Sequence, residues 1–166
     1  MAERVIQGRV HKFGDNINTD LISPAQYMEF SNDVIAAHAM EGADPDFPKR
    51  MKPGDIVVAG KNFGSGSSRE TAPIALKEIG VSVVIAEFYA RIFYRNCINI
   101  GLSVLICDQA DEINGGDELS VYPQSGVIRN LSTGKEYHCR PLPENILSII
   151  EHGGLMGYLE HHLESK

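Results

Sequence analysis

The chain has 166 residues, a net charge of −7, and ordinary hydrophobic (43%) and charged (22%) fractions, which predicts one compact soluble domain over residues 1–166. No basic block occurs, which argues against nucleic acid as a partner. No apolar run approaches the roughly 18 residues of a membrane span. The N-terminal segment also lacks the apolar core of a signal peptide, so we expect a cytoplasmic protein.

Strand and helix patterns alternate over the first two thirds of the chain. In order, we expect a strand at 5–13, a polar loop at 14–24, a helical or irregular segment at 25–38, a loop at 43–53, a strand at 56–59, a helix from 71 to about 78 with Gly80 as its C-cap, a strand at 81–86, a helix at 88–96 and a strand at 102–107. This rhythm favours right-handed crossovers and a parallel core sheet.

The last third of the chain has a different pattern. Short strands at 118–122, 127–130 and 136–139 are separated by turn residues, and a final helix that begins near 143–144 is broken at 153–154. Strands joined by short turns predict an antiparallel meander. The expected fold class is therefore α/β, with a mainly parallel core sheet, flanking helices and a C-terminal antiparallel meander.

A glycine-rich junction, GKNFGSGSSRE at residues 60–70, connects the strand at 56–59 to the following helix. A strand that runs into such a loop and then a helix is a common place to bind an anion. The junction fits neither of two familiar phosphate motifs. A P-loop needs its lysine directly after the second glycine, whereas Lys61 follows the first, and a dinucleotide fingerprint needs a glycine where Arg69 stands. A stand-alone nucleotide-binding domain is therefore disfavoured.

The end of the junction carries groups suited to a carboxylate. Gly66 lets the backbone turn tightly. Ser67 and Ser68 place hydroxyls at the expected helix N-terminus, where the helix dipole favours negative charge, including that of an alkoxide. Arg69 offers a planar guanidinium that matches a carboxylate. Spacing alone leaves open the alternative that one serine only caps the helix and Arg69 is a surface residue.

No metal site is predicted in this chain. The three cysteines, Cys97, Cys107 and Cys139, have no ligand-like spacing, and we expect buried free thiols. The adjacent His161 and His162 lie in a polar C-terminal stretch and are interpreted as a surface pair.

Four segments are similar to one known family. They are FGDNINTDLISP at residues 13–24, NFGSGSSRE at 62–70, AEFYARIFYRNCINIGL at 86–102 and IIEHGGLMGYL at 149–159. In this order they resemble the swivelling-domain subunits of the aconitase superfamily, most closely the small subunits of 3-isopropylmalate dehydratases and homoaconitases. The resemblance extends over nearly the whole chain and implies the swivelling β/β/α fold.

The resemblance also implies a reaction and a partner. Enzymes of this family move a hydroxyl between adjacent carbons of a hydroxy-dicarboxylic acid by dehydration and rehydration, and a 4Fe-4S cluster in their large subunit acts as a Lewis acid. This chain lacks a cysteine triad for such a cluster. It is therefore expected to bind no cofactor itself and to act in a heterodimer or heterotetramer with a large iron–sulfur subunit.

The expected reaction converts 2-isopropylmalate to 3-isopropylmalate in leucine biosynthesis. A homoaconitase, or a dehydratase of another alkyl-malate such as dimethylmalate, is the alternative within the family. A non-catalytic carboxylate-binding module that keeps the loop is an alternative of a different class.

By the same resemblance, individual residues receive roles. Ser67 matches the serine that removes a proton from carbon, and Asp20 matches an acidic residue in the hydrogen-bonded network of the site, which Thr19 orients. Ser68 and Arg69, together with Gly66, match the groups that hold a substrate carboxylate. An Asx-turn in a polar loop is the alternative explanation for Asp20.

The sequence departs from the family pattern at two places. Thr71 stands where many relatives have histidine, so no role of that histidine can be transferred. The segment expected to read the variable group of the substrate contains Met28, Glu29 and Phe30, whereas homoaconitases tend to have an arginine near Glu29. A glutamate facing inward repels an extra carboxylate, and the two apolar side chains suit a branched alkyl group.

Overall fold

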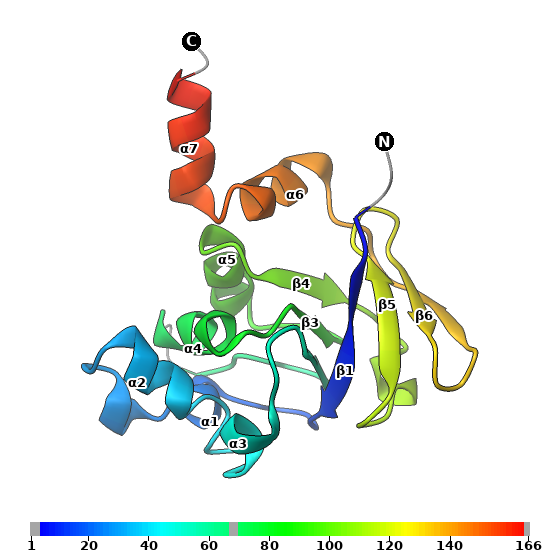
Figure 1. Ribbon diagram of the computed structural model, residues 1–166, viewed down its shortest axis with the longest axis horizontal. Coiled ribbons are helices and arrows are strands. Elements are labelled where there is room, and N and C mark those ends of the chain that lie inside the picture. Colours follow the sequence, from blue (N-terminus) through cyan, green and yellow to red (C-terminus); the bar gives the residue numbers. More distant parts are fainter. Residues whose placement is uncertain (1–3, 67–69, 165–166) are drawn as a thin grey trace.

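The computed structural model describes residues 4–66 and 70–164 (Figure 1). The helices are α1 (Thr19–Ile22), α2 (Asn32–Ala37), α3 (Phe47–Arg50), α4 (Thr71–Ile79), α5 (Arg91–Asn99), α6 (Glu144–Glu151) and α7 (Leu155–Glu164), with short 3-10 turns at η1 (Ala25–Tyr27) and η2 (Ala110–Glu112). The strands are β1 (Ile6–Lys12), β2 (Ile56–Ala59), β3 (Val83–Ala86), β4 (Ser103–Ile106), β5 (Glu118–Tyr122), β6 (Val127–Asn130) and β7 (Glu136–His138).

The strands form one mixed sheet with the order β4-β3-β2-β1-β5-β6-β7. Strands β1 to β4 are parallel, with Val10 opposite Ile56 and Ile56 opposite Val83. Strands β5 to β7 continue from β1 as an antiparallel meander. The sheet curls, because the backbone N–H of Arg140, after β7, donates to the carbonyl of Ile106 in β4 over 3.1 Å. The predicted α/β class, with a parallel core and a C-terminal meander, is confirmed.

The two faces of the sheet pack against separate apolar cores. One core holds Val57, Ala59, Val84 and Val104 and is covered by side chains of α2, α4 and α5. The other is enclosed by the curl of the sheet and holds residues such as Ile56, Val58, Ile85 and Leu119. Burial on both faces explains why the strands β2 and β3 are apolar at every position.

Glycine residues end two of the helices at the positions that the sequence predicts. Gly80 ends α4 with φ of +108°, a left-handed conformation that glycine adopts readily. Gly153 and Gly154 separate α6 from α7, and α7 projects from the rest of the chain (Figure 1). Over the described ranges 4–66 and 70–164, no helix has the length and apolar content that crossing a bilayer requires.

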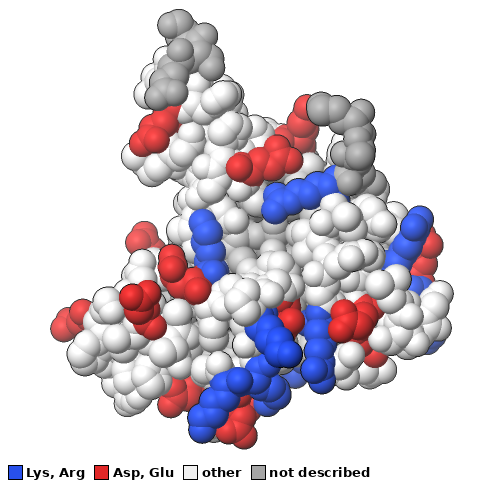
Figure 2. All heavy atoms as spheres, viewed as in Figure 1, with Lys and Arg blue, Asp and Glu red and all other residues white. Residues whose placement is uncertain are grey.

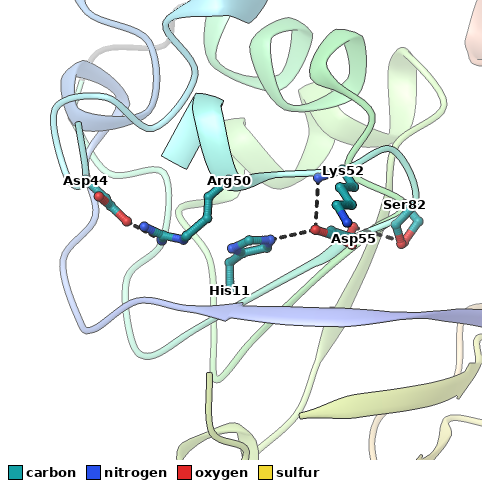
Figure 3. A network of polar contacts seen from close by, with 7 residues as sticks. His11, Asp44, Arg50, Lys52, Asp55 and Ser82 are labelled. Carbon is teal, nitrogen blue, oxygen red and sulfur yellow. Dashed lines mark hydrogen bonds and ion pairs between the residues drawn. The ribbon is translucent and has the colours of Figure 1, made fainter. Parts of the chain in front are cut away.

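A network of polar contacts connects strand β1 with the turn that precedes strand β2 (Figure 3). His11 Nε2 lies 2.7 Å from Asp55 Oδ2, and the backbone N–H of Lys52 donates to the same carboxylate over 3.0 Å. His11 is 7% and Asp55 9% exposed. The neighbouring Arg50–Asp44 ion pair lies at the surface, where Figure 2 shows basic side chains gathered over α3 and the adjacent end of β1.

We expect Asp55→Ala to lower the free energy of unfolding by about 3 kcal/mol, because His11 and the Lys52 N–H then lose a charged acceptor inside the protein. Urea unfolding measures this loss. Asp44→Ala is the matched control, since it breaks an exposed ion pair with Arg50 and is expected to cost less than about 1 kcal/mol. Equal losses in the two variants would contradict a structural role for the buried pair.

Candidate active site

Two loops that follow neighbouring parallel strands are hydrogen-bonded along their length. The backbone N–H of Thr19 donates to the Ser65 carbonyl over 2.8 Å, and the N–H of Gly64 donates to the Ile17 carbonyl, also over 2.8 Å. Farther from Thr19, Lys61 donates its backbone N–H to Asp15 Oδ1 over 2.7 Å. The structure therefore brings together the Thr–Asp segment and the glycine-rich junction, which are more than forty residues apart in the sequence.

Gly64 and Gly66 both occupy positions that disfavour a side chain, for reasons that differ in part. Gly64 has φ of +84°, and a Cβ atom there would lie 2.1 Å from Cγ of Phe93. Gly66 has φ of +95° and faces Thr19, whose Oγ1 would lie 3.7 Å from an added Cβ. Both residues thus need the left-handed conformation that glycine tolerates, and at Gly64 the close approach of an aromatic ring excludes any larger residue.

A cluster of aromatic side chains packs against the glycine-rich junction. The ring of Phe63 packs edge-on against Phe93, with centroids 5.2 Å apart, and against Tyr89 at 6.1 Å. The Tyr89 hydroxyl donates to the carbonyls of Val84 and Leu105, each over 2.8 Å, and burial raises the pKa of this phenol well above its usual range. The loop therefore packs on an aromatic cluster that is hydrogen-bonded to strands β3 and β4.

The helical turn α1 presents Asp20 at its start. Asn18 caps the turn, because its Oδ1 accepts a hydrogen bond from the Leu21 N–H over 2.9 Å. Thr19 is buried, and Asp20 is exposed and accepts the N–H of Ala25 through Oδ1 over 3.2 Å. The side chain predicted to join the site network is therefore at the surface and is hydrogen-bonded to the first residue of η1.

Ser67, Ser68 and Arg69 lie outside the described residues. The described chain ends this loop at Gly66 and resumes at Glu70, directly before α4. Thr71 begins α4, and its hydroxyl is buried without a hydrogen-bond partner among the described residues.

The segment predicted to read the substrate is an exposed turn next to α1. Met28 is 41% and Phe30 59% exposed, and Glu29 is exposed as well. Tyr27 anchors the turn, because its ring stacks on that of His38 with centroids 3.6 Å apart and planes 5° from parallel. His38 in turn contacts the carboxylate of Glu41. In this chain the apolar side chains of the turn are therefore open to a ligand or another chain.

Sequence reasoning missed several residues that build this region. Asn18 and Asp15 fix the first loop, Phe93 sets the space at Gly64, and His38 holds Tyr27. An asparagine directly before Thr–Asp is an N-cap signal that could have revealed the helical turn. The contacts of Asp15, Phe93 and His38 join residues that are far apart in the sequence or are contacts between rings, so no local sequence pattern predicts them.

The three cysteines are free and buried, as predicted. Within residues 4–66 and 70–164, no group of three or more His, Cys, Asp or Glu side chains is arranged to hold a metal ion.

The chain is a swivelling-type α/β domain. It has a curled, mixed sheet, and its glycine-rich loop is hydrogen-bonded to the turn that contains Thr19 and Asp20. Residues 10–110 match the sequence profile of the aconitase C-terminal domain, and the chain belongs to this family. The resemblance found in the sequence is confirmed.

Proteins similar to this chain over nearly their full length are small subunits. The 3-isopropylmalate dehydratase small subunit of Nautilia profundicola is 53% identical, with 96% of this chain and 97% of the relative covered. The isopropylmalate/citramalate isomerase small subunit of Methanocaldococcus jannaschii is 54% identical, with 94% of each chain covered. The methanogen homoaconitase small subunit of Methanothermobacter thermautotrophicus is also 54% identical, with 94% and 91% covered.

A solved structure supports the same assignment. The crystal structure of 3-isopropylmalate dehydratase (LeuD) from Methanocaldococcus jannaschii superposes with a TM-score of 0.92 at 43% identity, covering 96% of each chain.

Proposed function

We propose that this chain is the small subunit of a two-chain hydro-lyase that converts 2-isopropylmalate to 3-isopropylmalate. The observation that carries the proposal is the hydrogen bond from Thr19 to Ser65, which joins both family motifs at one edge of a swivelling domain. Full-length relatives named 3-isopropylmalate dehydratase small subunit support it. The place of this reaction in leucine biosynthesis follows from the substrate.

In this proposal Ser67 is the base that removes a proton from the carbon beside a carboxylate. Such a proton is weakly acidic, so a serine hydroxyl can take it only where backbone N–H groups and positive charge stabilise the alkoxide. The positive φ of Gly64 and Gly66 turns the chain immediately before Ser67, and α4 begins just after Arg69. In this proposal the positive end of the α4 dipole helps to stabilise the alkoxide of the base.

Ser68 and Arg69 are proposed to bind a substrate carboxylate, with the backbone of Gly66 beside them. Arg69 would hold the carboxylate through two parallel hydrogen bonds. Asp20, presented by the turn that Thr19 and Ser65 fix, is proposed to complete the polar network opposite the loop.

A partner chain is proposed to supply the iron–sulfur cluster. The cysteines of this chain do not fit one, because Cys97 lies in the core under the helices whereas Cys107 and Cys139 lie in the core enclosed by the sheet. The cluster would act as a Lewis acid on the substrate hydroxyl. The exposed Asp20, Met28 and Phe30 are proposed to face the large subunit, which closes the site.

The side chains at 28–30 favour a branched alkyl substrate over homoaconitate. Met28 and Phe30 offer apolar surface, whereas Glu29 would repel an additional carboxylate. The homoaconitase alternative remains relevant, because a relative with that name is as similar to this chain as those named for isopropylmalate.

We expect Glu29→Arg to shift the ratio of kcat/KM for homocitrate over 2-isopropylmalate upward by about tenfold, which corresponds to roughly 1.4 kcal/mol. The new guanidinium would attract the carboxylate that glutamate repels. Steady-state kinetics with both substrates on the assembled enzyme measure the ratio. Glu78→Arg, at an exposed position of α4, is the control, and an equal shift there would mean that the change in net charge alone causes the effect.

A substrate panel tests the proposed function. The chain, assembled with its large subunit, is assayed with alkyl-malates, citrate and homocitrate. The proposal expects the highest kcat/KM with 2-isopropylmalate. Activity with homocitrate alone would replace it by the homoaconitase alternative, and carboxylate binding without turnover of any of these acids would favour the non-catalytic module.

A further inference from the structure

Cys107 and Cys139 meet where the curled sheet closes on itself. Cys107 directly follows β4, and Cys139 directly follows β7, the two outer strands in the sheet order. Their neighbours Ile106 and Arg140 are joined by a backbone hydrogen bond of 3.1 Å. Each cysteine backbone is also fixed, since Cys107 N–H donates to Ala86 over 2.9 Å and Cys139 N–H to Gly126 over 2.7 Å.

The two thiols interact directly. The neighbouring Cys139 side chain lowers the pKa of Cys107, although burial opposes the change. The Cys107 side chain, followed by burial, raises the pKa of Cys139. The pKa values of the two thiols therefore shift in opposite directions, with the lower pKa at Cys107, as in dithiols that react stepwise.

A surface hollow leads to the Cys139 side of the pair. Cys139 is 8% exposed and lines a surface hollow of about 270 Å³ whose other walls include Asp108, His138 and Arg140. Cys107, at 1% exposure, lies behind it. The third cysteine, Cys97, is fully buried in the helix-covered core, and burial raises its pKa well above the usual range.

We propose that Cys107 and Cys139 are a modification site for hydroperoxides, at which oxidation forms a reversible intramolecular disulfide across the closure of the sheet. The Cys107 thiolate attacks one oxygen of hydrogen peroxide, the O–O bond breaks, and the second oxygen leaves as hydroxide and takes up a proton to form water. Cys139 then transfers its proton to the hydroxyl of the resulting sulfenic acid and attacks the Cys107 sulfur. Two thiols and one peroxide give one disulfide and two waters.

The reaction would link two strands that no covalent turn connects. β4 and β7 are brought together only by the curl of the sheet, so a bond between their ends restricts the unfolded chain and resists separation of the two halves. The oxidised chain is therefore expected to unfold at a higher temperature than the reduced chain.

Peptide mapping of the full chain tests the proposal. Reduced protein is freed of reductant, exposed to hydrogen peroxide, unfolded in urea while iodoacetamide blocks the remaining thiols, digested and analysed by mass spectrometry without reduction. We expect a disulfide-linked pair of peptides containing Cys107 and Cys139, an intact mass lower by two hydrogen atoms, an alkylated Cys97, and full reversal by dithiothreitol.

Variants separate the two steps. Cys139→Ser is expected to stop at a sulfenic acid on Cys107 that dimedone traps, whereas Cys107→Ser leaves Cys139 unreacted and Cys97→Ser reacts like the unmodified chain. If a serine variant fails to fold, the wild-type peptide map alone decides. Bridges to Cys97 or between molecules, or both thiols still alkylated after peroxide has oxidised free cysteine in the same tube, would overturn the proposal.

Discussion

Ser67→Ala, assembled with the large subunit, is expected to lose about 10²–10⁴-fold in kcat, the range that a positioned general base contributes. Alanine keeps the backbone of the loop but removes the only group proposed to take the proton from carbon. Binding of the carboxylate through Ser68 and Arg69 would remain, so KM is expected to change little. Steady-state assays with 2-isopropylmalate measure both parameters.

Ser65→Ala is the matched control for this variant. Ser65 lies two positions earlier in the same loop, and its contribution to the Thr19 contact comes from the backbone carbonyl, which alanine retains. Turnover near that of the unmodified enzyme is expected there. The Ser67→Ala chain should also compete with the unmodified chain for the large subunit, which shows assembly. Turnover above about a tenth of the unmodified value in Ser67→Ala would reject this residue as the base, because a tenfold loss is smaller than a general base supplies.

Gly64→Ala is expected to destabilise the chain by about 2–6 kcal/mol. A left-handed conformation costs a non-glycine residue roughly 1–3 kcal/mol, and overpacking adds about 1–3 kcal/mol, because the new methyl would overlap the ring of Phe93. For a chain of this size each kcal/mol lowers Tm by roughly 2–4 °C. Thermal unfolding followed by circular dichroism measures the shift.

Substitutions at two other glycines distinguish the cost of the left-handed conformation from the cost of steric overlap. Gly116 has φ of +88° but no atom within 4 Å of an added Cβ, so Gly116→Ala is expected to show the conformational cost alone, about 1–3 kcal/mol. Gly14 has neither feature, and Gly14→Ala is expected to be close to neutral. If the Gly64→Ala chain were as stable as the Gly116→Ala chain, the ring of Phe93 would have to move aside for the new methyl group. That result would contradict a tightly packed aromatic cluster under the loop.

The fold could be predicted where burial leaves a recognisable pattern of apolar residues in the sequence. The fully apolar strands β2 and β3 could be recognised because they are covered on both faces, and Gly80 marked the end of α4. Residues 88–90 were predicted to begin a helix, which is wrong. Phe63 instead donates its backbone N–H to the Phe88 carbonyl and accepts the N–H of Ala90, so α5 begins only at Arg91. A pairing partner so distant in the sequence overrides local helix propensity.

The candidate site was predictable in its parts but not in its assembly. Motif similarity singled out Thr19, Asp20 and Gly66, yet no sequence pattern shows that Thr19 bonds to Ser65 or that a polar loop contains the one-turn helix α1. The Tyr27–His38 stack likewise depends on the packing of α2. The roles of Ser67, Ser68 and Arg69 remain predictions from the resemblance, and the variants above test them.

A titration of the large subunit with this chain tests the central claim, that the chain is one half of a hydro-lyase. Formation of 3-isopropylmalate from 2-isopropylmalate is followed at a fixed concentration of large subunit with an intact iron–sulfur cluster. The account predicts no turnover by either chain alone, and a rate that rises and saturates at equal amounts of the two chains. Turnover by one chain alone, or none at any ratio, would contradict it.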